Sequence, residues 1–498
     1  MDMTKYNAAM SAAYWEKWDS KVQAKIDRDI EANRMADGHF TLESVPAGAD
    51  VQVEQIQSQF IFGAHIFNFD QLGSDERNAK YRALYGHDGL FNSATIAFYW
   101  KQLELEEGKP RFNAEYRDSA DFWNKCPAPK QQPHWRRPAV EPVVQFCKSK
   151  GIRLHGHTLV WGNCNWQWPE WLIAKLPLDA LLKADLTRHP VVGRLKNNAL
   201  ASVFGDMTAE QFAEKYPAFT SYLNTVTARR IMEIAIRYGD QIDSWDVANE
   251  SSTDFGKGNM IPGSKICKSW YGPMPGDYTF RAFKIAESVL PDKAKLNIND
   301  YNLTEDYLRQ IQDLRSRGCK IDIIGAQMHL FNPQICLDIA NGIPIDSNAA
   351  HADVQSPDAV YATFQRLAKA GLPIHLSEIT ITAPNNDERG QAIQAVITRN
   401  LYRLWFSLKP MLGITWWNVV DDCGAPGEPS VSGLFSRDMV PKPAYFVLDD
   451  LINHEWKTRT CVKAEKDGSI AFRGFRGTYR LKWQGLDGLE HSKEVVLA

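Results

Sequence analysis

Several features that mark particular classes of protein are missing from this sequence of 498 residues. Its formal net charge is only −3, so it lacks the positive charge with which proteins bind nucleic acid or anionic membranes. No apolar run approaches the roughly 20 residues of a membrane-spanning helix. Its eight cysteines include no C-x-x-C pair, which argues against a zinc knuckle or a redox motif, and their even number permits disulfides without requiring them. We therefore expect a globular protein with no nucleic-acid partner and no membrane span.

The amino-terminal residues also lack the pattern of a secretory signal. They contain no basic head, apolar core and small-residue cleavage site in succession. Two explanations stay open: a cytoplasmic protein, or a mature or recombinant form from which a signal was removed. The length is sufficient for a large barrel with an accessory unit.

The middle of the chain alternates short apolar segments with longer helical stretches, which is typical of β/α units. The predicted strands are Phe60–Ala64, Ala94–Tyr99, Ile152–Val160, Ile242–Ala248, Lys295–Asn299, Ile323–Gln327, Ile374–Ile379 and Gly413–Val419. The predicted helices between them are Val140–Lys150, Leu223–Tyr238, Tyr278–Val289, Tyr307–Arg317, Ala359–Ala370 and Arg389–Ser407. No Gly-rich phosphate turn follows any of these strands, so an open doubly wound sheet is disfavoured. We predict an α/β fold, a (β/α)8 TIM barrel, whose long connections 162–222 and 330–357 build the binding cleft.

The two ends of the chain have a different character. Residues 13–36 predict an amphipathic helix, and the segments FTLESV and VQVEQIQ that follow predict antiparallel strands. From about Thr458 onward, short strands alternate with turns such as Asp467-Gly468. We expect the two ends to form one small β-rich accessory domain. The predicted organisation is 1–59 for the N-terminal helix and strands, 60–452 for the barrel and 453–498 for the C-terminal strands.

Two glutamates follow from this architecture as candidates for catalysis. The fourth predicted strand leads into Asn249 and Glu250, and the seventh leads into Glu378. Active sites of TIM barrels lie at the C-terminal ends of the strands. One carboxylic acid there protonates a glycosidic oxygen while the other carboxylate attacks the anomeric carbon. A solvated salt bridge would explain either glutamate alone, but not two at matching strand ends.

The motifs around these glutamates resemble glycoside hydrolase family 10, the endo-β-1,4-xylanases. The segment WDVANE at Trp245–Glu250 is similar to the acid/base signature of that family, and SEI around Glu378 is similar to its nucleophile motif. The resemblance covers about residues 60–452. The other similar segments, in the order of the family, are HTLVW at His157–Trp161, NDYN at Asn299–Asn302, GAQMHL at Gly325–Leu330, TWWNVVD at Thr415–Asp421 and GLFSRDMVPKPAYFVL at Gly433–Leu448.

The resemblance implies a retaining hydrolase of β-1,4-linked xylan or a related plant or algal β-glycan. It implies that Glu250 is the acid/base, that Glu378 is the nucleophile and that Asn249 binds the sugar hydroxyl next to the anomeric centre. It also implies that the enzyme is secreted, periplasmic or at the cell surface, and this chemistry needs no cofactor and no metal. The remaining substrate-binding residues are predicted to be His157, Trp161, Tyr301, Gln327, His329 and Trp417.

The resemblance is incomplete outside the catalytic pair. Where the family has a Glu, an Asn and a Lys that hold the next sugar outward, this chain has Thr95, Ile96 and Tyr99. The acidic residue two positions after the nucleophile is Thr380, so His329 lacks its expected charged partner. The other departures are Gly162 in place of a His, the inserted run Asn163–Trp168 and the lack of a second Trp after Asp422. These changes leave xylan, another β-glycan or a substituted xylo-oligosaccharide open as substrate, as well as endo or exo action.

Two other classes of protein compete with this hypothesis. His155 and His157 face the same way on a strand and, with His329 and His375, suggest a metal-dependent hydrolase barrel. That class places its H-x-H motif on the first strand rather than the third. A non-catalytic carbohydrate-binding protein is the second alternative, against which the presence of both Glu250 and Glu378 argues. The sequence does not indicate an oligomeric state.

Overall fold

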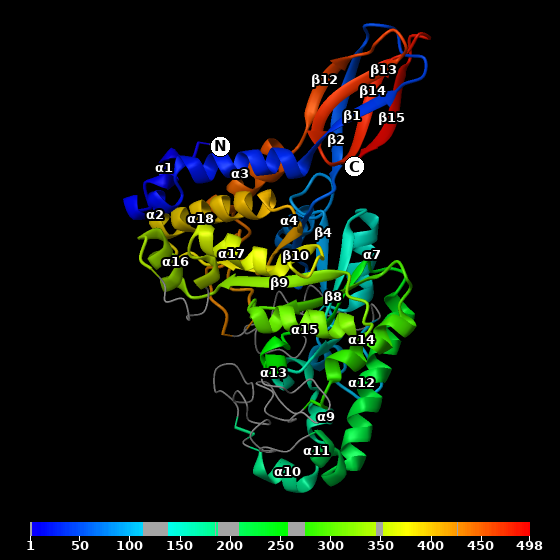
Figure 1. The fold of residues 1–498 in the computed structure, drawn as a ribbon, viewed down its shortest axis with the longest axis vertical. Helices are drawn as coiled ribbons and strands as arrows, with labels where there is room; N and C mark the ends of the chain where they lie inside the picture. Colours follow the sequence, from blue (N-terminus) through cyan, green and yellow to red (C-terminus); the bar gives the residue numbers. More distant parts are fainter. Residues whose placement is uncertain are drawn as a thin grey trace.

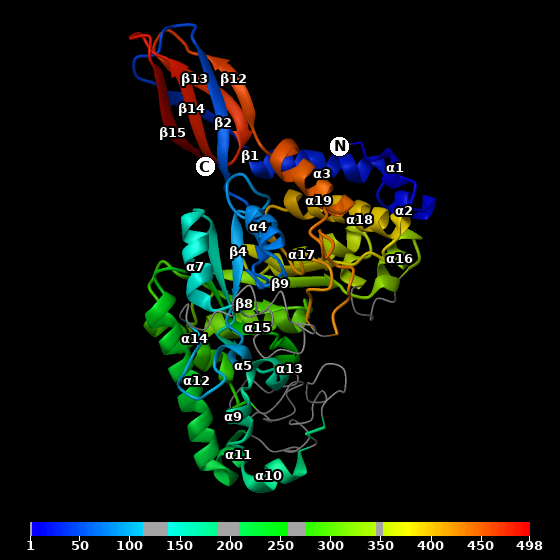
Figure 2. The ribbon, with the colours of Figure 1, turned by 180° about the vertical axis from the view of Figure 1, so that it is seen from behind.

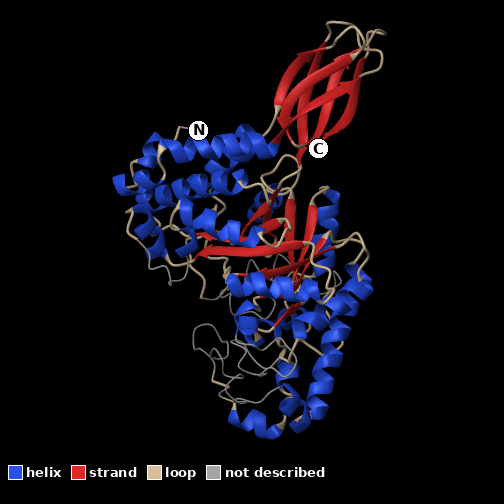
Figure 3. Cartoon of the chain, in the orientation of Figure 1, coloured by secondary structure: helices blue, strands red, loops and turns tan. Residues whose placement is uncertain are grey.

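The computed structural model describes residues 2–112, 138–184, 186–187, 209–256, 274–344, 352–425 and 427–498. They form a helix-covered barrel and a β-sandwich that projects from one end of it (Figures 1 and 3). Strand β2 (Asp50–Ser58) of the sandwich runs almost directly into β3 (Ile61–His65) of the barrel. The sandwich therefore lies at the end where the barrel strands begin, away from the end where their carboxyl termini meet (Figure 2).

The barrel is a closed sheet of parallel strands. Its remaining strands are β4 (Ser93–Ala97), β5 (Arg153–His157), β6 (Val160–Trp161), β7 (Ser244–Asn249), β8 (Lys295–Asp300), β9 (Ile323–Leu330), β10 (Ile374–Ile381) and β11 (Met411–Trp416). Their order is β5-β4-β3-β11-β10-β9-β8-β7-β6, and β5 also pairs with β7, which closes the ring. Because β5 and β6 both pair with β7, they act as one interrupted strand. The predicted eight-stranded barrel is confirmed.

Two predicted strands differ in detail. Ile152–Val160 is interrupted because Thr158 and Leu159 both donate hydrogen bonds to the carbonyl oxygen of Asp246, at 2.9 Å each, instead of continuing the ladder. The last strand ends at Trp416, before the predicted Val419, because Asn418 takes a left-handed backbone conformation with φ 57°.

The six predicted helices are all present, with ends shifted by a few residues. The largest shift is in α12, which begins at Pro217, where a proline suits the first turn of a helix. The helices that follow the N-terminal region are α4 (Asp75–Ala83), α5 (Trp100–Leu103), α7 (Val140–Ser149), α8 (Cys164–Gln167), α9 (Glu170–Ile173), α10 (Leu178–Lys183), α11 (Ala209–Lys215), α12 (Pro217–Tyr238), α13 (Ser252–Gly256), α14 (Tyr278–Val289), α15 (Glu305–Ser316), α16 (Pro333–Ala340), η4 (Ala352–Val354), α17 (Pro357–Ala368), α18 (Glu388–Ser407), α19 (Pro443–Asp449) and η5 (Asp450–Glu455).

The N-terminal region forms α1 (Thr4–Asn7), α2 (Ala12–Lys17) and α3 (Ser20–Arg34), so the prediction of one helix over 13–36 is wrong. The interruption has a local cause. The side chain of Asp19 accepts hydrogen bonds from the amides of Lys21 and Val22, which caps a new helix. The region packs on α18, where Asn400 donates to the hydroxyl of Tyr14 at 2.8 Å.

The accessory unit contains strands from both chain ends, as predicted. β1 (Met35–Thr41) pairs with β13 (Ser469–Phe475), and β2 lies between β12 (Arg459–Lys463) and β14 (Gly477–Gln484), with β15 (Glu490–Leu497) at the edge. All these pairings are antiparallel. Alternate side chains of the two sheets meet in a core that includes Tyr479 and Leu481, both fully buried.

The six cysteines in the described part of the chain are free, and Cys126 and Cys267 lie outside it. Among the described residues, no helix combines the length and the hydrophobicity needed to cross a membrane.

The sandwich core predicts a measurable cost for removing one of its side chains. Leu481→Ala should lower the free energy of unfolding by about 2–5 kcal/mol, because the cavity at a fully buried leucine collapses only partly. Urea denaturation followed by circular dichroism measures this change. Val496→Ala is the control on the neighbouring strand, since Val496 is 66% exposed, and its effect should stay within about 0.5 kcal/mol. Equal midpoints for the two variants would contradict the assigned core.

Candidate active site

The two predicted catalytic glutamates lie at one end of the barrel on different strands. Glu250 follows β7 directly and has a left-handed backbone with φ 52°, held by a hydrogen bond from its amide to the carbonyl of Asn299 at 2.7 Å. Glu378 does not end its strand as predicted, because β10 continues to Ile381. The pairing register shifts between Leu376 and Glu378, and such a bulge redirects a side chain relative to the regular pleat.

The amide of Gln327 joins the two glutamates. Its Nε2 atom lies 2.9 Å from Oε1 of Glu378 and 3.3 Å from Oε1 of Glu250. The same atom lies 3.3 Å from Oδ1 of Asn249. One nitrogen therefore contacts three predicted site residues, and the two carboxylates are separated by no more than the span of two hydrogen bonds.

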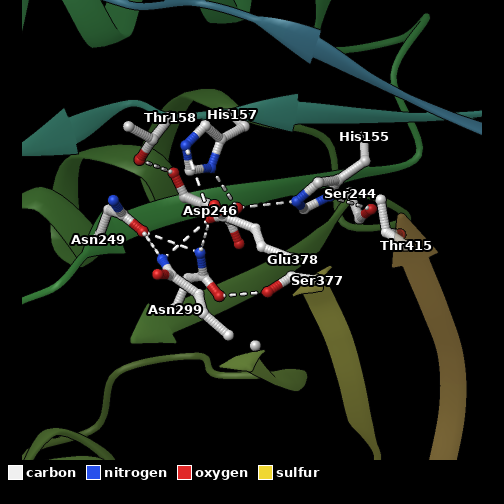
Figure 4. Close-up of polar contacts among 12 residues, drawn as sticks. His155, His157, Thr158, Ser244, Asp246, Asn249, Asn299, Ser377, Glu378 and Thr415 are labelled. Atoms are coloured by element: carbon white, nitrogen blue, oxygen red, sulfur yellow. Dashed lines mark hydrogen bonds and ion pairs between the residues drawn. The ribbon is translucent and has the colours of Figure 1, made fainter. Parts of the chain in front are cut away.

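Asn299 is a site residue that the sequence analysis missed, although it begins the NDYN motif. Its Nδ2 atom donates to Oε1 of Glu378 at 2.9 Å and to Oδ1 of Asn249 at 2.8 Å (Figure 4). The hydroxyl of Ser377 donates to Oδ1 of Asn299 and fixes the orientation of the amide. Gly325 leaves room for this side chain, because a Cβ atom there would collide with Oδ1 of Asn299. The signal that could have identified Asn299 is its position at the end of β8, directly beside Asn249.

Two histidines that the sequence analysis named as substrate-binding residues lie against the Glu378 carboxylate. Nε2 of His157 is 3.8 Å from Oε1, and Nε2 of His329 is 3.3 Å from Oε2. On its other side, Nδ1 of His329 lies 3.0 Å from the hydroxyl of Thr380. A neutral hydroxyl therefore holds the ring where the sequence analysis noted a missing charged partner.

A buried ion cluster lies below the site. The Oδ2 atom of Asp246 is 2.9 Å from Nε2 of His155 and 2.8 Å from Nδ1 of His157 (Figure 4). Burial alone would raise the pKa of Asp246, but the two histidines outweigh it and hold that pKa well below its usual range. Ser244 contacts the other nitrogen of His155 at 2.8 Å. The cluster thus fixes the ring of His157, whose free edge faces Glu378.

Aromatic side chains form the wall of the site beside β3, β4 and β11. Trp161 and Trp417 were predicted here, whereas Phe67 and Tyr99 complete a cluster that the sequence analysis had not assigned to the site. Of the three residues noted at the end of the second strand, only Tyr99 reaches this wall. Ile96 belongs to the main core, and Thr95 lies buried within β4. Tyr301, also predicted, is 42% exposed beyond the end of β8.

The histidines that suggested a metal-dependent hydrolase have other partners. His155 and His157 share Asp246, and Nε2 of His375 lies 2.8 Å from the hydroxyl of Thr415. Within the described ranges, no group of three or more His, Cys, Asp or Glu side chains is placed to hold a metal ion. This arrangement favours the pair of carboxylates as the reactive groups.

A comparison with protein families agrees with the geometry. The family model of glycosyl hydrolase family 10 matches residues 123–451. The chain belongs to this family. The matched segment includes β5 to β11 and both glutamates, and β3 and β4 complete the family 10 barrel on the N-terminal side.

Relatives within family 10 are distant. Endo-1,4-beta-xylanase A of Thermoanaerobacterium saccharolyticum is 26% identical over 321 residues, which cover 62% of this chain and 22% of the relative. Exoglucanase XynX of Acetivibrio thermocellus is 26% identical over 319 residues, 62% of this chain and 24% of the relative. The match thus spans less than a quarter of either relative. Xylanase 10B of Thermotoga petrophila, solved with xylobiose, shares the fold with a TM-score of 0.52 and 20% identity, over 80% of this chain and 95% of that chain.

The buried imidazole of His375 predicts a dependence of stability on pH. Burial, aided by the nearby His155, lowers the pKa of His375 from 6.5 to about 3. The unfolded chain therefore binds a proton below pH 6.5 that the folded chain binds only near pH 3, so this contribution to stability is present above pH 6.5 and is lost as the pH falls through that window. His375→Gln should make the slope of unfolding free energy against pH shallower by up to about 1.4 kcal/mol per pH unit.

Urea denaturation between pH 4 and pH 6.5 measures this slope. The control is His454→Gln, which removes a histidine whose side chain is 64% exposed, and the change in slope should be larger for His375→Gln. An unaltered slope in His375→Gln would exclude the buried neutral histidine as its source.

Proposed function

We propose that this chain is a retaining glycoside hydrolase that cleaves β-1,4-linked xylan or a related β-glycan by double displacement. The bridging nitrogen of Gln327 is the observation that carries the proposal. This nitrogen lies 2.9 Å from Oε1 of Glu378 and 3.3 Å from Oε1 of Glu250, so the separation of these two oxygens cannot exceed those two distances together. Inverting enzymes separate their carboxyl groups by about 6.5–9.5 Å to admit a water molecule, whereas retaining enzymes keep them about 5–5.5 Å apart. The shorter separation supports direct attack by one carboxylate.

The surroundings of Glu378 support its role as the nucleophile. Two amide donors, from Asn299 and Gln327, point at its Oε1 atom. Such hydrogen bonds favour the ionised carboxylate, which is the form that attacks the anomeric carbon. As the bond to the sugar forms, the leaving oxygen takes a proton from Glu250. In the second step Glu250 removes a proton from the water that releases the sugar.

Asn249 is oriented for the substrate. Its Oδ1 atom accepts hydrogen bonds from both Asn299 and Gln327, so its Nδ2 atom must point the other way. That nitrogen is buried and has no hydrogen-bond partner among the described residues. An unpaired buried donor costs about 1–3 kcal/mol, which a sugar hydroxyl would offset. We propose that this hydroxyl is the one next to the anomeric carbon.

The same contacts disfavour a protein that only binds carbohydrate, because binding requires neither a buried ionised carboxylate nor a second acid beside it. The choice of xylan rests on the names of the family 10 relatives, which include an endo-1,4-beta-xylanase and an exoglucanase. We further propose that the protein is secreted, periplasmic or on the cell surface, because a polymeric glycan does not cross a membrane.

The two glutamates should respond differently to the leaving group. Glu250→Ala should lower kcat/KM, which reports the first step, by about 10²–10⁴-fold for a glycoside with a poor leaving group and much less for a dinitrophenyl glycoside, which leaves without protonation. Glu378→Gln should abolish turnover of both, because the nucleophile serves every substrate. Steady-state kinetics of the purified variants measure this, with the exposed Glu305→Gln as control. Full turnover of the dinitrophenyl glycoside by Glu378→Gln would disprove the assignment.

The stereochemistry of the first product is a separate prediction. Two successive displacements restore the starting configuration, so a β-glycoside should release the β-anomer first. Proton NMR of the anomeric region, recorded within minutes of adding enzyme, distinguishes it from the α-anomer before mutarotation mixes them. Initial release of the α-anomer would rule out the covalent route through Glu378.

A further inference from the structure

We infer that the active site binds only one sugar on the glycone side, which is the side of the scissile bond that carries the anomeric carbon. The enzyme therefore removes terminal sugars one at a time. This inference rests on the proposed roles of Glu250 and Glu378. It adds the mode of attack, which the similarity to family 10 leaves open. The observation behind it is the part of the aromatic wall formed by Phe67, Tyr99 and Trp417.

The two glutamates define a direction across the barrel mouth. Glu250 must reach the bridging oxygen, so the leaving group lies on the β7 side of the site. The sugar that is attacked lies over Glu378, and any sugar attached to it extends away from Glu250. In the order of strands around the barrel, β11 lies opposite β7 and has β3 and β10 as its two neighbours, and β4 follows β3.

The aromatic wall occupies this far side. Phe67 follows β3, Tyr99 follows β4 and Trp417 follows β11. The ring of Phe67 lies 5.1 Å from that of Trp417 and 5.8 Å from that of Tyr99, centre to centre, and both pairs meet edge to face. Tyr99 in turn lies 5.8 Å from Trp161. Phe67 is fully buried and Trp417 is 3% exposed, so these rings fill the space that a second sugar would need.

His65 holds the ring of Phe67 in place. The ring of His65 stacks on Phe67 at 4.4 Å, with an angle of 9° between the planes. Nε2 of His65 accepts a hydrogen bond from the amide of Asn418 at 2.8 Å, and the carbonyl of His65 accepts hydrogen bonds from Tyr81 and Tyr85. A ring packed this closely does not move aside without opening a cavity in the core.

One aromatic residue on the opposite side of the site is exposed. Tyr301, beyond the end of β8 and therefore next to the β7 side, is 42% exposed, in contrast to the buried rings across the mouth. In the inferred arrangement the leaving group extends past Tyr301, and the buried rings exclude a second sugar beyond the attacked one. This asymmetry fits a substrate whose non-reducing terminal sugar enters the site and whose remaining chain stays outside.

The test compares aryl glycosides of one and two sugars on the unaltered enzyme, in parallel for β-xylose and β-glucose. We expect the para-nitrophenyl monoside to release nitrophenol. The para-nitrophenyl bioside should release nitrophenol and an intact disaccharide at least about tenfold more slowly than the monoside releases nitrophenol, because the pocket excludes the second sugar. Mass spectrometry of a pentasaccharide labelled at its reducing end should show loss of single sugars from the other end. Intact disaccharide from the bioside at an equal or higher rate, or early internal cleavage, would overturn the inference. If none of the four aryl glycosides were hydrolysed, the proposed function would be overturned instead.

Variants of the wall test its cause. Tyr99→Ala and Phe67→Ala should raise the ratio of bioside to monoside turnover by about tenfold, because each opens space beyond the attacked sugar. Phe446→Ala is the matched control, since Phe446 is 46% exposed on the outer helix α19, and its ratio should equal that of the unaltered enzyme. Because the ratio is internal to each variant, partial loss of folded protein does not affect it. An unchanged ratio in a folded Tyr99→Ala variant would argue against the wall as the determinant.

Discussion

The burial of Glu378 is the constraint on which the site depends, because the residue is 5% exposed and its carboxylate needs hydrogen-bond donors from the surrounding structure. A buried charge is tolerated only when hydrogen-bond donors replace the lost water. Here the donors come from β8 and β9, as the amides of Asn299 and Gln327, while histidines approach from β5 and β9. Ser377 orients the amide of Asn299 through a further hydrogen bond. Because the donors come from several strands, the site exists only when the barrel is closed.

The same constraint explains the buried ion cluster beneath the site. Asp246 holds His157 in place through one nitrogen and leaves the other facing Glu378. His155 shares the same carboxylate oxygen and is tied to Ser244. Thr380 plays the corresponding part for His329 with a neutral hydroxyl. The two histidines beside Glu378 are thus positioned by partners of different charge.

The residues that we propose for specificity lie just outside the sheet. Phe67, Tyr99 and Trp417 each follow the last residue of a barrel strand, where side chains vary without disturbing the hydrogen-bonded ladder. Glu378 and its donors lie on the strands themselves. The family 10 barrel can therefore keep its catalytic groups while aromatic rings reshape the space for the next sugar.

Much of this molecule was predictable from the sequence, because periodic patterns and ordered motifs are local. They predicted the barrel and the strands at the two chain ends, and they singled out Glu250 and Glu378 as candidates. The break between α2 and α3 at Asp19 was missed although it too is local, because helical periodicity continues across it. Only the tertiary structure decided that Asn299 touches Glu378 and that Ile96 faces the core. The same holds for the contact between Phe67 and Tyr99, which follow two neighbouring strands. These contacts depend on strand register and on the order of strands around the barrel, and no spacing along the chain encodes either directly.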